Sequence, residues 1–154
     1  MIIMEITNNY NAPFPFKGLR LDRVKRWGII SMDKAQSVAE HSFNVAVITE
    51  IIAYKLGMTE PDVNQLVIDA IYHDCDETYT GDIPSPAKNS SERVPTIIKL
   101  ADCIESYRFA MSHCNDTIKV KQWLTNGLRK EILVLIRKLN ISYTIIQPLI
   151  EEVQ

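Results

Sequence analysis

Apolar residues recur at helical spacing along most of the chain. The clearest stripe lies within residues 35–56 and consists of Val38, Val45, Ile48, Ile52 and Leu56. This spacing places the apolar side chains on one face of an α-helix. Gly57 follows as a natural stop, because glycine readily adopts the left-handed conformation that ends many helices. The pattern therefore predicts a helix that buries one face.

A second helix is predicted to begin after Thr59, a typical N-cap residue, with Pro61 in its first turn. Its expected inner face consists of Val63, Leu66, Val67, Ala70 and Ile71. Weaker patterns of the same kind predict further helices, at about 19–27, 95–111, 116–139 and 142–153.

Two segments are predicted to be loops, residues 11–18 and 78–90, because proline and glycine interrupt any helical pattern there. The chain contains no convincing period-two strand pattern, although ISYTII at residues 141–146 is ambiguous. We therefore expect an all-α bundle of about six helices that forms a single domain over residues 1–154.

The composition fits a soluble protein. Of 154 residues, 46% are hydrophobic and 23% are charged, and the net charge of -2 gives no basic field for a nucleic-acid polymer or an anionic membrane. No apolar run approaches the roughly 20 residues of a membrane span, and the start, MIIMEITNN, does not resemble a signal peptide. The three cysteines form no CxxC pair. We expect a cytoplasmic protein (host cytoplasm if viral) without disulfides.

Candidate chemistry centres on two histidines that fall in apolar helical contexts. His41 lies three residues after Val38 on the buried stripe, and His73 follows the inner face of the next helix. An unpaired imidazole is costly to bury, so each ring is expected to have a partner. We predict one divalent-metal site with the ligands His41, His73, Asp74 and Asp102.

The nitrogen and oxygen donors of this set suit zinc, manganese, cobalt or iron better than a soft thiophilic metal. Such an ion can activate a water molecule as a nucleophile near neutral pH. Adjacent residues on a regular helix point about 100° apart. His73 and Asp74 can therefore share one ion only where the helix ends or is distorted.

Groups that could serve hydrolysis of a phosphoester accompany this set. Glu77 lies four residues after His73, close enough to orient the attacking water. Arg26 and Lys88 are candidate cations for phosphate, since arginine offers a planar fork and lysine a point charge.

The ordered motifs resemble those of the HD-domain 5′-deoxynucleotidases and of the short phage HD phosphohydrolases that cleave dATP. The likeness covers about residues 19–112. It rests on Arg26-Trp27, Val38-Ala39-Glu40-His41-Ser42, His73-Asp74, Glu77, Thr80-Gly81-Asp82-Ile83-Pro84-Ser85-Pro86, Lys88 and Lys99-Leu100-Ala101-Asp102.

The resemblance implies an HD-domain fold, a homo-oligomer and one divalent ion (zinc, cobalt, manganese or magnesium). It implies cleavage of the 5′ phosphoester of deoxynucleotides, which releases triphosphate from dATP or another dNTP, or phosphate from a dNMP. Glu77 matches the catalytic acid group, and Asp82 a polar group near the sugar or the attacking water. The implied substrate-binding residues are Arg26, Lys88 and Lys99 for phosphate, Trp27 against the sugar and Ile29 at the base.

The chain departs from the family at Gly28, where proline is common, and in a shorter stretch between Asp74 and Asp102. Both departures bear on substrate choice. Two alternatives are an HD hydrolase of another nucleotide phosphoester, such as a guanosine alarmone, and a non-catalytic helical interaction module. The Arg26-Trp27 pair argues against the first, and the complete ligand set with Glu77 argues against the second.

Overall fold

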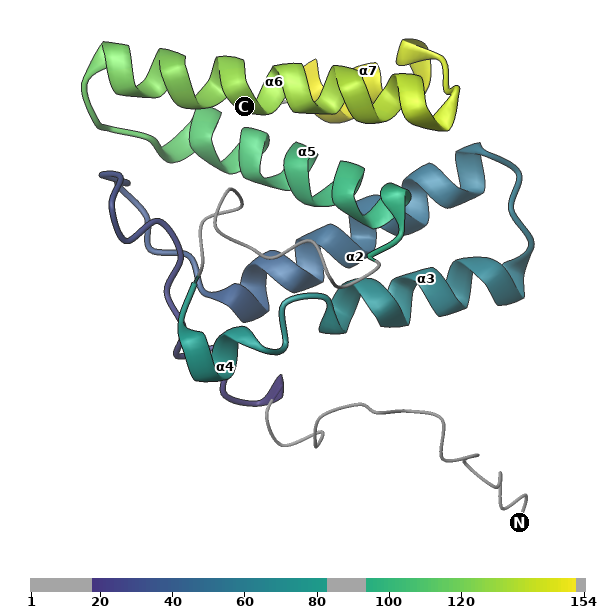
Figure 1. The fold of residues 1–154 in the computed structure, drawn as a ribbon, viewed down its shortest axis with the longest axis horizontal. Coiled ribbons are helices and arrows are strands. Elements are labelled where there is room, and N and C mark those ends of the chain that lie inside the picture. The colour runs from purple at the N-terminus through teal and green to yellow at the C-terminus, as the bar shows by residue number, and fades with distance from the viewer. Residues whose placement is uncertain (1–17, 83–93, 152–154) are drawn as a thin grey trace.

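The computed structural model describes residues 18–82 and 94–151, and within these ranges the protein is an all-α bundle. The helices are α2 (Val38–Lys55), α3 (Glu60–Tyr72), α4 (Glu77–Thr80), α5 (Thr96–His113), α6 (Ile118–Leu139) and α7 (Tyr143–Glu151). Figure 1 shows α5 between α2 on one side and α6 on the other, with α3 alongside α2. The predicted fold class is confirmed.

Local signals set the helix ends close to where the sequence predicts them. The side chain of Ser37 accepts a hydrogen bond from the Glu40 N–H and caps α2. Gly57 has φ +71° after α2, and Thr59 is the N-cap residue of α3. The left-handed Asn140 ends α6.

The helix predicted at about 19–27 is wrong. Residues 19–23 form turns, and the backbone of Val24 and Arg26 pairs with residues at and just before the start of α2. The Arg26 N–H donates to the Gln36 carbonyl, and the Val38 N–H donates to the Val24 carbonyl. Long-range pairing thus overrides a weak local pattern.

The predicted loop at 78–90 is wrong at its start, because residues 78–80 belong to α4. Positions 83–90 of this loop, like positions 11–17 of the other predicted loop, lie outside the described residues.

One apolar core joins the long helices. Its fully buried members include Val45, Ile52, Ile98, Leu100, Ile104, Ile132 and Ile146. Each such side chain stabilises the fold by roughly 1.5–3 kcal/mol relative to an exposed position. The packing therefore fixes α2, α3 and α5 against one another, and these are the helices that carry the predicted metal ligands.

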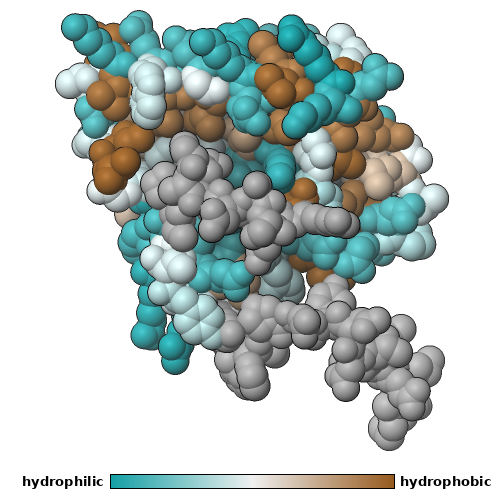
Figure 2. Space-filling model, in the orientation of Figure 1, coloured by the Kyte–Doolittle hydropathy of each residue, from teal (hydrophilic) through white to brown (hydrophobic). Residues whose placement is uncertain are grey.

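The face drawn in Figure 2 mixes polar and apolar residues. Among the described residues, no helix is long and apolar enough to cross a membrane.

Candidate metal centre

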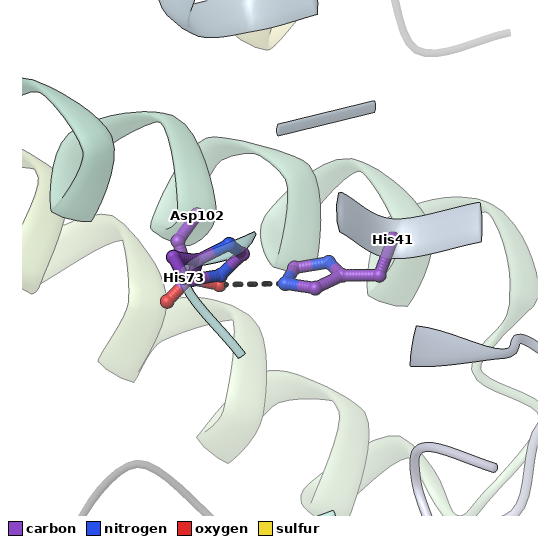
Figure 3. A group of neighbouring side chains, drawn as sticks. All are labelled: His41, His73 and Asp102. Carbon is purple, nitrogen blue, oxygen red and sulfur yellow. Dashed lines mark ion pairs between the residues drawn. The ribbon is translucent and has the colours of Figure 1, made fainter. Parts of the chain in front are cut away.

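Three helices bring His41, His73 and Asp102 to one point. His41 lies on α2, His73 is the C-cap residue of α3, and Asp102 lies on α5. Each residue offers one potential ligand atom, and these three atoms lie within 4.8 Å of one another. Figure 3 shows the side chains converging, with the His41 Nε2 atom 3.1 Å from the Asp102 Oδ1 atom.

Asp74 joins this group because the chain turns sharply after α3. Its Oδ2 atom lies 3.2 Å from the His73 Nε2 atom and 3.7 Å from the His41 Nε2 atom. The Cys75 N–H donates to the Tyr72 carbonyl, three residues back, in place of the four-residue spacing of an α-helix. The helix end thus lets two adjacent side chains approach one centre. Asp74 contacts both histidine rings, whereas the group of mutually close ligand atoms consists of His41, His73 and Asp102.

The donor set fits a divalent cation. The Nε2 atoms of His41 and His73 are buried, and neither has a hydrogen-bond partner of acceptable geometry in the described part of the chain. The opposite ring nitrogens are engaged elsewhere: the His73 Nδ1 atom lies 2.6 Å from the Ala70 carbonyl, and the His41 Nδ1 atom lies 2.5 Å from Glu105 Oε2. With protons on both Nδ1 atoms, both Nε2 lone pairs point at the centre, as in metal-binding histidines.

Neighbouring groups hold the Asp102 carboxylate in its ionised form. Burial raises the pKa of Asp102, but contact with His41 and the nearby Arg26 guanidinium outweigh burial and lower the pKa to about 2. For His41, burial and the Arg26 charge oppose protonation, whereas the carboxylates of Asp102 and Glu105 favour it and raise its pKa. The centre is therefore an anionic site that attracts positive charge.

The two residues predicted to be catalytic, Glu77 and Asp82, follow Asp74 by three and eight residues in the sequence. Glu77 is the first residue of α4 and is 4% exposed, and its N–H donates to the carbonyl of Asp74. Asp82 faces the Arg26-Trp27 pair: its Oδ2 atom accepts a hydrogen bond of 3.3 Å from the Trp27 N–H, and its Oδ1 atom lies 3.8 Å from Arg26 Nε.

The Arg26-Trp27 pair belongs to an irregular segment, residues 24–37, which we call the Arg-Trp segment. Trp27 has φ +67°, a left-handed conformation that is unusual for a bulky residue and costs about 1–3 kcal/mol. Three contacts hold it there besides the one to Asp82. Its ring stacks on Phe109 with 6.0 Å between centroids, its Nε1–H donates to Gln36 Oε1 at 2.9 Å, and the Arg26 guanidinium lies 5.1 Å from its ring centroid.

The other predicted substrate residues lie differently. Ile29 is 85% exposed in a turn of the Arg-Trp segment, and Lys99 is exposed on α5, one turn before Asp102. Lys88 lies outside the described residues.

Sequence reasoning missed Glu105 and Gln36, which are 3% and 1% exposed. Glu105 follows Asp102 by three residues on α5, so a carboxylate on the buried face beside a predicted ligand was the available signal. Burial raises the pKa of Glu105, but its contacts with His41, Arg26 and Asn44 outweigh burial and lower it. Glu105 is therefore a buried carboxylate directly behind the metal centre.

The all-α bundle thus gathers two histidines and two aspartates on α2, on α5 and at the end of α3. A family profile described as "5′-deoxynucleotidase YfbR-like" matches residues 16–119. The chain belongs to this family, as its motifs predict.

Curated relatives include 5′-deoxynucleotidases and phage enzymes. A 5′-deoxynucleotidase of Pasteurella multocida is 29% identical over 98 residues, which cover 60% of this chain and 49% of that protein. A dATP triphosphohydrolase of cyanophage S-2L is 33% identical over 85 residues, which cover 55% of this chain and 45% of that protein. The matched region thus spans about half the length of these relatives.

A solved structure shares the fold. The cyanophage S-2L HD phosphohydrolase, bound to dA and one catalytic Zn²⁺ ion, superposes with a TM-score of 0.65 at 20% identity. The match covers 88% of this chain and 98% of that one.

Proposed function

We propose that this protein is a metal-dependent phosphohydrolase that cleaves the 5′ phosphoester of deoxynucleotides. The observation that carries the proposal is the buried centre, where the Nε2 atoms of two imidazoles, neither with a hydrogen bond in the described residues, and two carboxylates converge beside the guanidinium of Arg26. The names of the relatives, 5′-deoxynucleotidase and dATP triphosphohydrolase, support this substrate class. The products would be a deoxynucleoside and either phosphate, from a dNMP, or triphosphate, from a dNTP such as dATP.

His41, His73, Asp74 and Asp102 would hold one divalent ion. Zinc is the first candidate, because imidazole nitrogen with carboxylate oxygen suits it and because the cyanophage structure carries zinc. When bound, the ion would supply Lewis-acid stabilisation of the phosphoryl group and activation of a water nucleophile.

The remaining residues would orient the substrate and move a proton. Glu77, buried one short turn after Asp74, would accept the proton of the attacking water. Arg26 would provide fixed positive charge for the phosphate oxygens, and Trp27 would pack against the sugar, where a 2′-hydroxyl would clash. Asp82 would keep Trp27 in place through its contact with the backbone N–H. Lys88, Lys99 and Ile29 remain candidates for outer contacts with phosphate and base.

The test is product analysis after incubation with dNMPs, dNTPs and the matching ribonucleotides, with zinc, cobalt, manganese or magnesium supplied in turn. We expect a deoxynucleoside product, with ribonucleotides turned over more slowly. Triphosphate from dATP would identify a triphosphohydrolase, and phosphate from dNMPs a nucleotidase. Glu77→Ala should lower the rate by about 100-fold or more, whereas the exposed control Glu50→Ala on α2 should not. An absence of turnover with every metal would contradict the proposal.

We also propose that the protein forms a homo-oligomer. The α6 residues Ile118 and Trp123 are 77% and 72% exposed, and large apolar side chains at a surface often mark a contact between subunits. Sedimentation of the metal-loaded protein should give at least a dimer at micromolar concentration; a monomer would contradict this proposal.

A further inference from the structure

We infer that Glu105 and Gln36 are positioning residues: together they form a buried bridge that orients the metal ligand His41 and, at the same time, the Arg26-Trp27 pair. The inference deepens the proposed function and rests on it. It goes beyond the ligands and substrate contacts, because neither residue belongs to the predicted site.

The first step is the contact of Glu105 with His41. The Glu105 Oε2 atom lies 2.5 Å from the His41 Nδ1 atom, and both side chains are almost fully buried. The Arg26 Nη1 atom is also close to this nitrogen, but a guanidinium only donates hydrogen bonds. Arg26 Nη1 donates to Glu105 Oε2 and to Gln36 Oε1, each at a nitrogen–oxygen distance of 3.2 Å. We therefore assign the proton to His41 Nδ1, which donates it to Glu105, and this tautomer leaves Nε2 free for a metal ion.

The second step concerns the side-chain amide of Gln36. Its neighbours determine which way it is oriented. Its Oε1 atom accepts from the Nε1–H of Trp27 at 2.9 Å and from Arg26. Both of these partners can only donate, so the oxygen must face them. The Nε2 atom then donates to the second carboxylate oxygen of Glu105, at 2.5 Å. One amide thus links the two members of the Arg26-Trp27 pair to the carboxylate behind the metal centre.

The third step is that no part of this bridge can move alone. Each oxygen of Glu105 has two partners: Oε2 contacts His41 and Arg26, and Oε1 accepts from Gln36 and, at 3.3 Å, from Asn44. Charge-assisted hydrogen bonds between buried groups are strong and geometrically specific. Loosening Glu105 should therefore change both the imidazole proposed to bind the ion and the guanidinium proposed to contact phosphate.

Glu105→Gln tests the first step, because it keeps the shape of the side chain and removes the charge that holds the Nδ1 proton. Metal affinity is measured by competition with a chromophoric chelator, using zinc and cobalt. We expect the affinity to fall about 10–100-fold and the visible spectrum of the cobalt-loaded protein to change. Glu105→Asp, which keeps the carboxylate but shortens it, should recover part of the affinity.

The control is Thr49→Val, a fully buried side chain on α2, two turns beyond His41, whose hydroxyl has no hydrogen-bond partner among the described residues. It should leave metal affinity and spectrum unchanged. Urea unfolding of each metal-free variant shows how much protein is folded, so affinity is expressed per folded molecule.

Gln36→Leu is the second variant. It should raise the KM for the deoxynucleotide about 10-fold while metal affinity falls less than in Glu105→Gln, because Glu105 still holds His41. If Glu105→Gln does not fold, Gln36→Leu is the remaining test of the inference, and an unchanged KM in Gln36→Leu would overturn it.

Two further results would also overturn it. The first is wild-type affinity and an unchanged cobalt spectrum in Glu105→Gln, even with reduced stability, which would leave Glu105 with a purely structural role. If the wild type turns over deoxynucleotides, this first result overturns the inference and leaves the proposed function intact. A wild-type protein that binds neither zinc nor cobalt would overturn the proposed function and the inference with it.

Discussion

The metal centre and the Arg-Trp segment are in direct contact, since Arg26 Nη1 lies 2.5 Å from His41 Nδ1, yet different forces hold them in place. The ligands of the centre lie on α2 and α5 and at the end of α3, which apolar packing locks together. The Arg-Trp segment has no helix of its own. Polar contacts with Asp82 and Glu105, and a hydrogen bond between Trp27 and Gln36 within the segment, hold it.

This difference suggests that substitutions in the two regions have different main effects, on metal binding and on substrate binding. A site on packed helices keeps its geometry when one polar residue changes, because the backbone is fixed by the core. A segment held by side-chain hydrogen bonds responds to each of its partners. Substitutions of the metal ligands should therefore affect metal binding without loss of fold, and substitutions in the Arg-Trp segment should affect substrate binding more than metal affinity, which they reach only through Glu105.

The largest effect is expected for His41→Ala. It removes a metal ligand from a helix whose packing stays intact, so the protein should fold but lose its ion. Activity should drop about 1,000-fold or more, because the ion supplies several kcal/mol of transition-state stabilisation. Metal content after dialysis and the rate with dATP or a dNMP are the measurements. A variant that retains one ion per chain would show that His41 is not a ligand.

The next largest effect concerns the core that supports the centre. Ile104 is fully buried on α5, between Asp102 and Glu105 in sequence. Ile104→Ala should lower the free energy of unfolding by about 2–5 kcal/mol, measured by urea denaturation of the metal-free protein. The molecules that remain folded should bind metal nearly as well as the wild type. A much weaker affinity per folded molecule would mean that packing alone does not fix the ligands.

The same contrast explains what the sequence could predict. The helices of the centre follow from apolar periodicity, and His41 was found because it interrupts a buried stripe. The approach of Asp74 to His73 followed from the need for a helix end, which the structure contains. These features depend on local patterns, which a single sequence carries.

The first residues of the Arg-Trp segment, 24–27, fall in the helix wrongly predicted at about 19–27, because their conformation depends on distant partners. Arg26 contacts Glu105, 79 residues away, and Trp27 contacts Asp82, 55 residues away. Nothing local in the sequence indicates that a tryptophan adopts a positive φ. The role of Glu105 was missed for the same reason, since its importance appears only once α2 and α5 pack together.

A smaller effect is expected for Trp27→Phe, which keeps the ring stacked on Phe109 but removes the Nε1–H that donates to Gln36. Losing one hydrogen bond of this kind costs roughly 0.5–1.5 kcal/mol, or about a 2–10-fold rise in KM. The preference for deoxynucleotides over ribonucleotides should weaken in parallel, while metal affinity stays the same. Steady-state kinetics with dATP and ATP, or dAMP and AMP, measure both. A fall in metal affinity would contradict the division between the two regions.

The smallest effect is expected at the outer end of the Arg-Trp segment, where His113 Nδ1 lies 2.8 Å from the Asp33 carboxylate. The Asp33 side chain is 56% exposed, so this pair should contribute little, within about 1 kcal/mol. The backbone hydrogen bond from the Asp33 N–H to the His113 carbonyl does not depend on either side chain. Asp33→Ala should therefore change KM and the urea midpoint only slightly. A KM change as large as that of Trp27→Phe would mean that the segment is held from both ends, and that its position depends on surface contacts as well as on the buried bridge.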